Sequence, residues 1–276
     1  LLEGTSGKSS KELADIFEFH GAHVSINSGI DYNTFVVYTL SSKLREIIDV
    51  VGQCLSDPVF PDHELNILKD IQRQQLRINN EKNNFVAGKE IRKLLYGNTH
   101  PYGRSLEIED VGDTLNAGLL LQYYRERLLN DVEIIISGKV TDESLKSLEV
   151  LNFLTVGNGK ILEHSFGDIS RSEATIEKPD SLQSSIRLGR RIIHKTHGDY
   201  IGLVILNELF GGFFGSRLMK NIREEKGYTY GVHSSIISNI YDSFWVIGTD
   251  VKKEFVKDTI EQIYLEMDRL GSDLIG

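Results

Sequence analysis

Apolar residues recur along the chain with the spacing of an amphipathic helix. In residues 9–20, Leu13, Ile16 and Phe17 fall on one face, and Gly21 follows where such a helix would end. The same pattern predicts further helices at residues 41–55, 62–80, 85–95 and 116–127. Each of these helices is expected to bury one face.

Shorter runs between the helices predict strands. Residues 23–28 and 34–40 flank the turn-rich segment GIDYN. Residues 132–138, VEIIISG, are continuously apolar and predict a fully buried strand. Strands that precede and follow groups of helices are typical of a layered α+β domain, and not of a parallel doubly wound one.

A similar order of elements recurs after a polar stretch at about residues 155–179. The pattern there predicts a strand at 184–193, helices at 199–209 and 216–225, a hairpin over 230–250 and a helix at 252–269. We therefore expect an α+β fold of two similar layered α/β domains, each an antiparallel-rich sheet with helices mainly on one face. The expected division is a first domain at 1–155, incomplete at its N-terminus, a linker at 156–179, and a second domain at 180–276, incomplete at its C-terminus.

Composition narrows the classes of partner. The chain has 276 residues, which favours two domains, and a formal net charge of −9 with dispersed Lys and Arg. This balance argues against nucleic acid or an anionic membrane surface as a partner and leaves peptides open. No apolar run reaches the length of roughly 18 residues that a membrane span needs. Cys54, the single cysteine, is expected to be a small core residue.

Residues 209–231, LFGGFFGSRLMKNIREEKGYTYG, are the most distinctive stretch of the chain. They join a glycine-rich turn, an amphipathic helix and a pair, Arg223 and Tyr230, seven residues apart. One interpretation is structural, because Ser216 would cap the helix and the charges would be solvated. In that interpretation the packing residues are Leu218, Met219 and Ile222. Phe213 and Phe214 are also expected to pack.

This stretch resembles the C-terminal-half signature of the pitrilysin/insulinase family of zinc metalloendopeptidases. Residues 96–104, YGNTHPYGR, resemble that family's Y-G-x-x-H-P-x-G-R, with His100 expected as a turn residue. The opening LLEGT resembles the segment after the family's zinc motif H-x-x-E-H, which would then lie upstream of Leu1. The resemblance implies that Arg223 and Tyr230 bind substrate at a zinc site carried by a different domain.

The resemblance also locates the family's third zinc ligand, a Glu on a helix introduced by a segment like DPVFPDHEL, residues 57–65. Aligned without gaps, the ligand position falls on Gln75, and a second acidic position of that helix falls on Leu68. A neutral amide is not among the usual ligands of zinc, and Leu68 cannot orient a metal-bound His. None of the eight histidines forms an H-x-x-E-H or H-E-x-x-H pair. We therefore expect a degenerate ligand slot and no catalytic or metal-binding residue in this chain.

Three hypotheses about function follow. The first is a non-catalytic subunit or half of a pitrilysin-like peptidase, which encloses a peptide or unfolded polypeptide in a chamber with a zinc-bearing homologous subunit. The zinc would then belong to the partner, or to the full-length protein if that protein is active. The second is an active zinc-dependent metalloendopeptidase whose H-x-x-E-H lies upstream of residue 1, so that enzyme activity is an open question. The third is a scaffold subunit that serves assembly alone.

Overall fold

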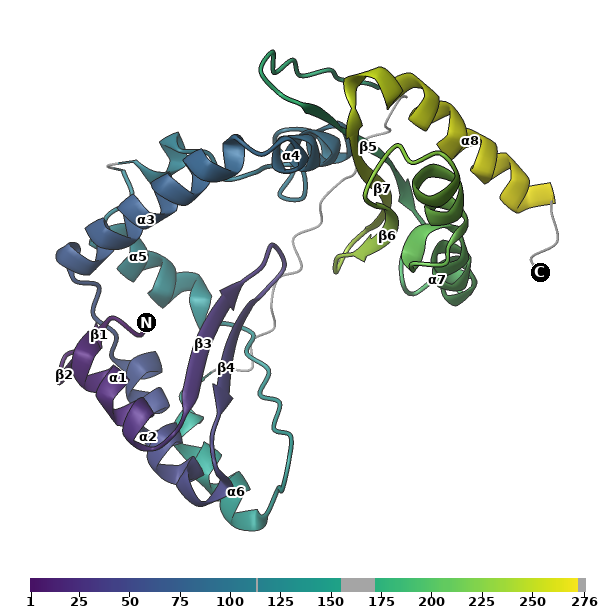
Figure 1. Cartoon of the computed structure of the whole chain (residues 1–276). Coiled ribbons are helices and arrows are strands. Elements are labelled where there is room, and N and C mark those ends of the chain that lie inside the picture. Colours follow the sequence, from purple (N-terminus) through teal and green to yellow (C-terminus); the bar gives the residue numbers. More distant parts are fainter. Residues whose placement is uncertain (113, 155–171, 273–276) are drawn as a thin grey trace. The chain divides into compact units, whose positions relative to one another are not determined.

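The computed structural model describes residues 1–112, 114–154 and 172–272, and these form two compact units (Figure 1). Of these, the first unit holds residues 1–76, 107–112 and 114–154, and the second holds residues 77–106 and 172–272. Residues 77–106 thus pack with elements much later in the chain. The expected linker at 156–179 stays a prediction, because most of it lies outside the described residues. No helix in the described ranges is long and apolar enough to cross a bilayer.

The first unit is built from helices and two antiparallel strand pairs. Its strands are β1 (Gly4–Thr5), β2 (Lys8–Ser9), β3 (His23–Ser28) and β4 (Asn33–Tyr38). Its helices are α1 (Ser10–Phe19), η1 (Ser41–Lys43), α2 (Leu44–Ser56), η2 (Glu109–Val111), α5 (Ala117–Tyr123), η3 (Tyr124–Leu128), α6 (Asp142–Ser147) and η4 (Leu148–Leu151). The core lies between α1 and α2 and includes Leu13, Ile47 and Cys54. Burial of Cys54 confirms its predicted core role.

Residues 132–138 do not form the buried strand that their apolar run predicts. They are irregular, and Ile135 is 82% exposed. A strand is stabilised by hydrogen bonds to a neighbouring strand, and the described residues supply no such neighbour here. The prediction of a buried strand is therefore wrong for this structure.

The second unit is a three-stranded antiparallel sheet between helices, and the order of its strands is β5–β7–β6 (Figure 1). The strands are β5 (Gln183–Ile192), β6 (Val232–Ser238) and β7 (Ser243–Lys252). The helices are α4 (Asn83–Tyr96), α7 (Tyr200–Asn207), η5 (Glu208–Gly212), η6 (Met219–Glu225), η7 (Lys253–Phe255) and α8 (Val256–Ser272). The helix α3 (Asp62–Asn80) contains the division between the two units. Helices joined to antiparallel sheets confirm the predicted α+β class.

The two faces of the three-stranded sheet differ in what covers them. One face forms a core in which Phe210, Ile222, Ile247 and Ile263 are essentially inaccessible. The other face receives α4, which approaches β5 so closely that a Cβ on Gly189 would lie 3.2 Å from Ile91 Cγ1. This close approach explains the glycine in the middle of β5.

Residues 96–104 form a turn that attaches the end of α4 to the sheet. His100 accepts a hydrogen bond at Nδ1 from the Tyr102 amide, 3.0 Å away, which confirms its predicted role as a turn residue. The Tyr96 ring meets Phe244 of β7 edge-on, with ring centroids 5.9 Å apart. Gly103 is required by the packing, because a Cβ there would lie 2.0 Å from the Gly97 carbonyl oxygen. The motif is therefore structural.

A buried carboxylate joins the helix of residues 217–225 to α8. Glu266 is 4% exposed and accepts hydrogen bonds from Asn221 Nδ2 at 2.7 Å, Arg269 Nη1 at 2.9 Å and Arg217 Nε at 3.0 Å. Burial acts to raise the pKa of Glu266. The hydrogen bonds from Asn221, Arg217 and Arg269 outweigh burial, so the pKa is lowered from its ordinary value of 4.5.

Two glycine substitutions test the turn at residues 96–104. Gly103→Ala should lower the free energy of unfolding by about 1–3 kcal/mol, because the methyl group overlaps backbone that cannot give way. Gly88→Ala, in the middle of α4, meets nothing within 4 Å and should raise stability by about 0.4–1 kcal/mol. Urea unfolding followed by the fluorescence of Trp245, the single tryptophan, reports on this unit. Equal effects of the two substitutions would contradict the packing described here.

The Glu266 network is tested by Glu266→Ala. This change leaves Arg217 and Asn221 without their buried acceptor and should cost about 3 kcal/mol of unfolding free energy. The control, Glu261→Ala, removes an exposed carboxylate from the same helix, 3.9 Å from Lys257, and should cost less than about 0.5 kcal/mol.

The same network predicts a dependence on pH. Because the folded-state pKa of Glu266 is lowered, its contribution is complete above the ordinary value of 4.5 and is lost as the pH falls through the folded-state pKa. The stability difference between the wild type and Glu266→Ala should therefore shrink on acidification in urea titrations at a series of pH values. A difference that grows at low pH would contradict this assignment.

Candidate functional site

The glycine-rich turn after α7 lies tightly against the edge strand β6. A Cβ on Gly211 would lie 2.7 Å from Ser234 Oγ and 2.9 Å from the Ser234 amide nitrogen. A Cβ on Gly212 would lie 2.6 Å from Glu208 Cδ. Gly211 thus allows close packing against β6, whereas Gly212 meets only the end of the flexible Glu208 side chain, and the exposed Phe213 and Phe214 follow.

The helix that follows is buried on one side, as its pattern predicts. Leu218 and Ile222 are 0% exposed, and Met219 is 8% exposed. The predicted side-chain cap is wrong: Ser216 is 1% exposed, and its hydroxyl makes no hydrogen bond with any residue that the structure describes. Its side chain packs in the interior, and only its carbonyl oxygen begins the helix by accepting from the Lys220 amide at 3.0 Å.

Arg223 projects from this helix onto an aromatic ring. Its guanidinium carbon lies 4.4 Å from the centroid of the Phe214 ring, which is within the range of a cation–π interaction. The Phe214 side chain is itself 64% exposed. No carboxylate among the described residues forms an ion pair with Arg223, so its donors are available to a ligand.

Hydrogen bonds made by Thr229 and Thr249 fix the backbone around Tyr230. Thr229 Oγ1 donates to the Asp250 carbonyl oxygen at 2.8 Å and accepts from the Gly231 amide at 3.1 Å. Thr249 Oγ1 donates to the Gly231 carbonyl oxygen at 2.9 Å. The backbone on both sides of Tyr230 is therefore fixed to β7, while the Tyr230 residue is 94% exposed.

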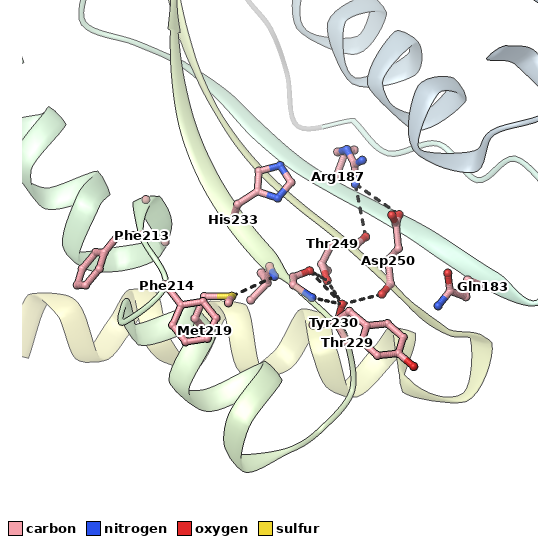
Figure 2. Close-up of a pocket in the computed structure, with 14 residues that line it drawn as sticks. Gln183, Arg187, Phe213, Phe214, Met219, Thr229, Tyr230, His233, Thr249 and Asp250 are labelled. Carbon is pink, nitrogen blue, oxygen red and sulfur yellow. Dashed lines mark hydrogen bonds and ion pairs between the residues drawn. The ribbon is translucent and has the colours of Figure 1, made fainter.

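A cleft of about 510 Å³ lies where the glycine-rich turn, residues 229–231 and the sheet meet (Figure 2). Its aromatic lining comes from Phe213, Phe214 and Tyr230, and its charged or titratable strand residues are Arg187, His233 and Asp250. Tyr230 lines the cleft, and Arg223 stacks on Phe214, which lines it too. Of the two residues predicted to bind substrate, Tyr230 thus lines the cleft itself, and Arg223 reaches it only through its contact with Phe214.

Sequence reasoning missed several of these residues. Phe213 and Phe214 were expected to pack, but they are 51% and 64% exposed, so that prediction is wrong. Two adjacent aromatic residues flanked by glycines lie in a turn too tight to bury both, and this signal could have identified them. Arg187 and His233 do not stand out in the sequence, because their strands, QSSIRLGRRI and VHSSIIS, contain several other polar residues.

Burial is the largest cause of the pKa shifts of the two cleft residues Arg187 and His233. Burial lowers the pKa of Arg187, and Asp250 opposes this shift. Burial, and after it the charge of Arg187, lowers the pKa of His233 from 6.5, so His233 is neutral at pH 7. The cleft therefore contains one cation, one carboxylate and a neutral imidazole.

The predicted ligand slot lies on α3, away from this cleft in the chain. Leu68 is 47% exposed, and Gln75 is exposed as well. The described residues contain no group of three or more His, Cys, Asp or Glu side chains placed to hold a metal ion. The amide of Gln75 and the hydrocarbon side chain of Leu68 do not fit zinc.

Comparison with known proteins gives matches along nearly the whole chain. The family described as "Insulinase (Peptidase family M16)" matches residues 1–107, and "Peptidase M16 inactive domain" matches residues 114–275. The "Uncharacterized zinc protease YmxG" of Bacillus subtilis is 26% identical over 85% of this chain and 57% of its own length. The "Probable inactive metalloprotease YmfF" of the same organism is 30% identical over 48% of this chain and 32% of its own length. The chain thus spans little more than half the length of the first of these relatives.

A solved structure shows the same fold. The "peptidase M16 inactive domain" from Pseudomonas fluorescens superposes with a TM-score of 0.86 at 23% identity, over 99% of this chain and 68% of that one. The family matches are to two successive domain descriptions, and the second alone covers more than half of the chain. The predicted resemblance is thereby confirmed, and the chain belongs to the insulinase, or M16, family of peptidases.

Proposed function

We propose that this chain is a non-catalytic subunit, or non-catalytic half, of an M16 peptidase that binds a peptide and offers Arg223 and Tyr230 to the active site of a zinc-bearing homologue. The observation that carries the proposal is Tyr230, a large aromatic residue that is 94% exposed on a backbone fixed to β7. A side chain that is exposed to this extent buries little surface in the second unit. An exposed aromatic side chain on a rigid backbone at the rim of a cleft is instead suited to binding.

The shape of the site supports a peptide as its ligand. The cleft of about 510 Å³ is within the range of small-molecule and peptide sites. It lies at the edge strand β6, which pairs with β7 on one side and with no other described strand. Such an edge can add an extended peptide as a further strand, and nearby cavities then receive alternate side chains.

The two predicted residues supply complementary donors. Arg223 carries a charged, planar group that the Phe214 ring orients, and Tyr230 carries a neutral hydroxyl. Both can donate hydrogen bonds to a peptide carbonyl, and such donors contribute most when negative charge develops on the carbonyl oxygen. In the proposal that carbonyl is presented at the partner's zinc.

The absence of a fitting donor set on α3 supports a non-catalytic role. Gln75 and Leu68 supply neither a carboxylate ligand nor a carboxylate that orients one. The family description "Peptidase M16 inactive domain" and the name of the relative "Probable inactive metalloprotease YmfF" are consistent with this role. Zinc would come from a homologous subunit or from the remainder of the full-length protein.

Peptide cleavage by the complex of this protein with its zinc-bearing partner tests the proposal. Arg223→Ala and Tyr230→Phe should each lower kcat by about 10²–10³, the usual effect of removing one such donor. Thermal unfolding should change little, because Tyr230 is exposed and the Arg223 guanidinium contacts the exposed ring of Phe214.

Matched controls are available on the same chain. Lys226→Ala removes an exposed cation close to Arg223, and Tyr32→Phe removes the hydroxyl of a tyrosine that is 67% exposed in the other unit. Neither control should change turnover. Full activity of both test variants would favour a pure scaffold, and loss of folding in them would show that the pair is structural.

The degenerate ligand slot gives a second test. A protein of residues 1–276, purified without chelator, should hold far less than one zinc per chain when its metal content is measured. The reason is the lack of a fitting donor set around Gln75 and Leu68. Stoichiometric zinc that is lost in Gln75→Ala would contradict the assignment.

A further inference from the structure

One cross-strand row of the second unit brings a cation and an imidazole together across a glycine. Arg187 of β5 is in register with Gly248 of β7, and Gly248 is in register with His233 of β6. Residues at the same level of adjacent strands project from the same face of a sheet. The order of this row is therefore Arg187, Gly248, His233, with no side chain in the middle.

The glycine opens the space in which the two side chains meet. A Cβ on Gly248 would lie 3.1 Å from His233 Cε1 and 3.2 Å from Arg187 Cζ. Both flanking side chains therefore extend over the central strand, and both line the cleft (Figure 2). Any other residue at position 248 would fill part of this space.

The Arg187 side chain is largely buried, and its positive charge is only partly offset by a nearby carboxylate. Its side chain is 15% exposed, and its nearest carboxylate oxygen, Asp250 Oδ1, is 3.9 Å from Nη1. Nη1 donates to the carbonyl oxygens of Ile186 at 2.8 Å and Thr249 at 3.4 Å. Within the described part of the chain, its Nε and Nη2 groups make no hydrogen bond. Asp250 also accepts a hydrogen bond from Ser185 Oγ, and its own side chain is 42% exposed.

The incomplete compensation of the Arg187 charge favours an anionic ligand. A buried cation is stable when a well-placed counter-charge and hydrogen bonds offset its lost hydration. Asp250 is too distant to form a direct hydrogen bond with Arg187. Its carboxylate is also 42% exposed and accepts a hydrogen bond from Ser185. The fork of Arg donors matches the two oxygens of a carboxylate. Neutral His233 adds one donor on the other side of Gly248.

We propose that Arg187 and His233 form a subsite for a carboxylate of the bound peptide, either an acidic side chain or the C-terminus. The inference rests on the proposed function, because it assumes that the cleft binds peptide. It adds a specificity that the Arg223 and Tyr230 pair does not give, since those two residues would contact backbone carbonyls. Asp250 sets the selectivity by disfavouring ligands that place a second negative charge nearby.

The test is a binding measurement on the full-length protein by fluorescence anisotropy at pH 7.5. One arm uses labelled, C-terminally amidated, otherwise neutral peptides in which a single Glu is moved along the sequence, each paired with its Gln counterpart. The other arm compares free and amidated C-termini of a neutral peptide. We expect at least one position, or the free C-terminus, to bind about tenfold or more tightly than its neutral counterpart. The arm in which this preference occurs identifies the source of the carboxylate.

Three substitutions connect that preference to the row. Arg187→Gln should abolish the preference while leaving binding of the neutral peptide in place. Gly248→Ala should reduce the preference, because the new methyl group enters the space between the two side chains. The control, Arg190→Gln, removes an exposed cation from the same strand and should leave the preference unchanged. Trp245 fluorescence verifies that each variant is folded.

Asp250→Asn should change the affinity for the acidic peptide in the direction opposite to that of Arg187→Gln. It removes the competing negative charge, retains an oxygen that can accept from Ser185, and should tighten binding of the acidic peptide severalfold. A purely structural role for Arg187 would not produce a gain. Equal binding of all charged and neutral pairs, or loss of the preference in Arg190→Gln, would overturn the subsite. Failure of every peptide to bind would overturn the proposed function as well.

Discussion

The carboxylate of Glu266 is the constraint on which the arrangement of the second unit depends. It accepts three hydrogen bonds from Asn221, Arg217 and Arg269, and so joins the helix of residues 217–225 to α8. An uncompensated carboxylate would be costly at 4% exposure, so the network fixes which face of the helix points inward. Arg223 then necessarily projects from another face, toward Phe214.

The second unit holds its two groups of candidate binding residues in different ways. Arg223 is half-buried on its helix, and Tyr230 is 94% exposed on a backbone that the hydroxyl groups of Thr229 and Thr249 hold. Arg187 is instead held within the sheet and is mostly buried. An exposed donor such as Tyr230 is suited to a site completed by a partner, whereas a buried cation is suited to discrimination between ligands.

Local patterns predicted the elements well, and long-range contacts explain what they missed. The helical period of residues 62–80 gave α3 with its observed bounds, because one buried face suffices to specify a helix. The apolar run at 132–138 failed because a strand also needs a partner. The Arg223 and Tyr230 pair could be proposed from the family resemblance of one short segment, residues 209–231. The row of Arg187 and His233 could not, because these residues are 46 positions apart in sequence and meet only through the register of both strands with β7.

The central claim is that a peptide occupies the cleft beside Tyr230. The most direct measurement replaces Tyr230 with the photoreactive amino acid p-benzoylphenylalanine and illuminates the complex of this protein and its zinc-bearing partner with a bound peptide. Mass spectrometry of the crosslinked products should find the peptide attached at position 230. The same replacement at Tyr32, which is also exposed but belongs to the other unit, should give far less product. Equal labelling at the two positions, or none at position 230, would contradict the account.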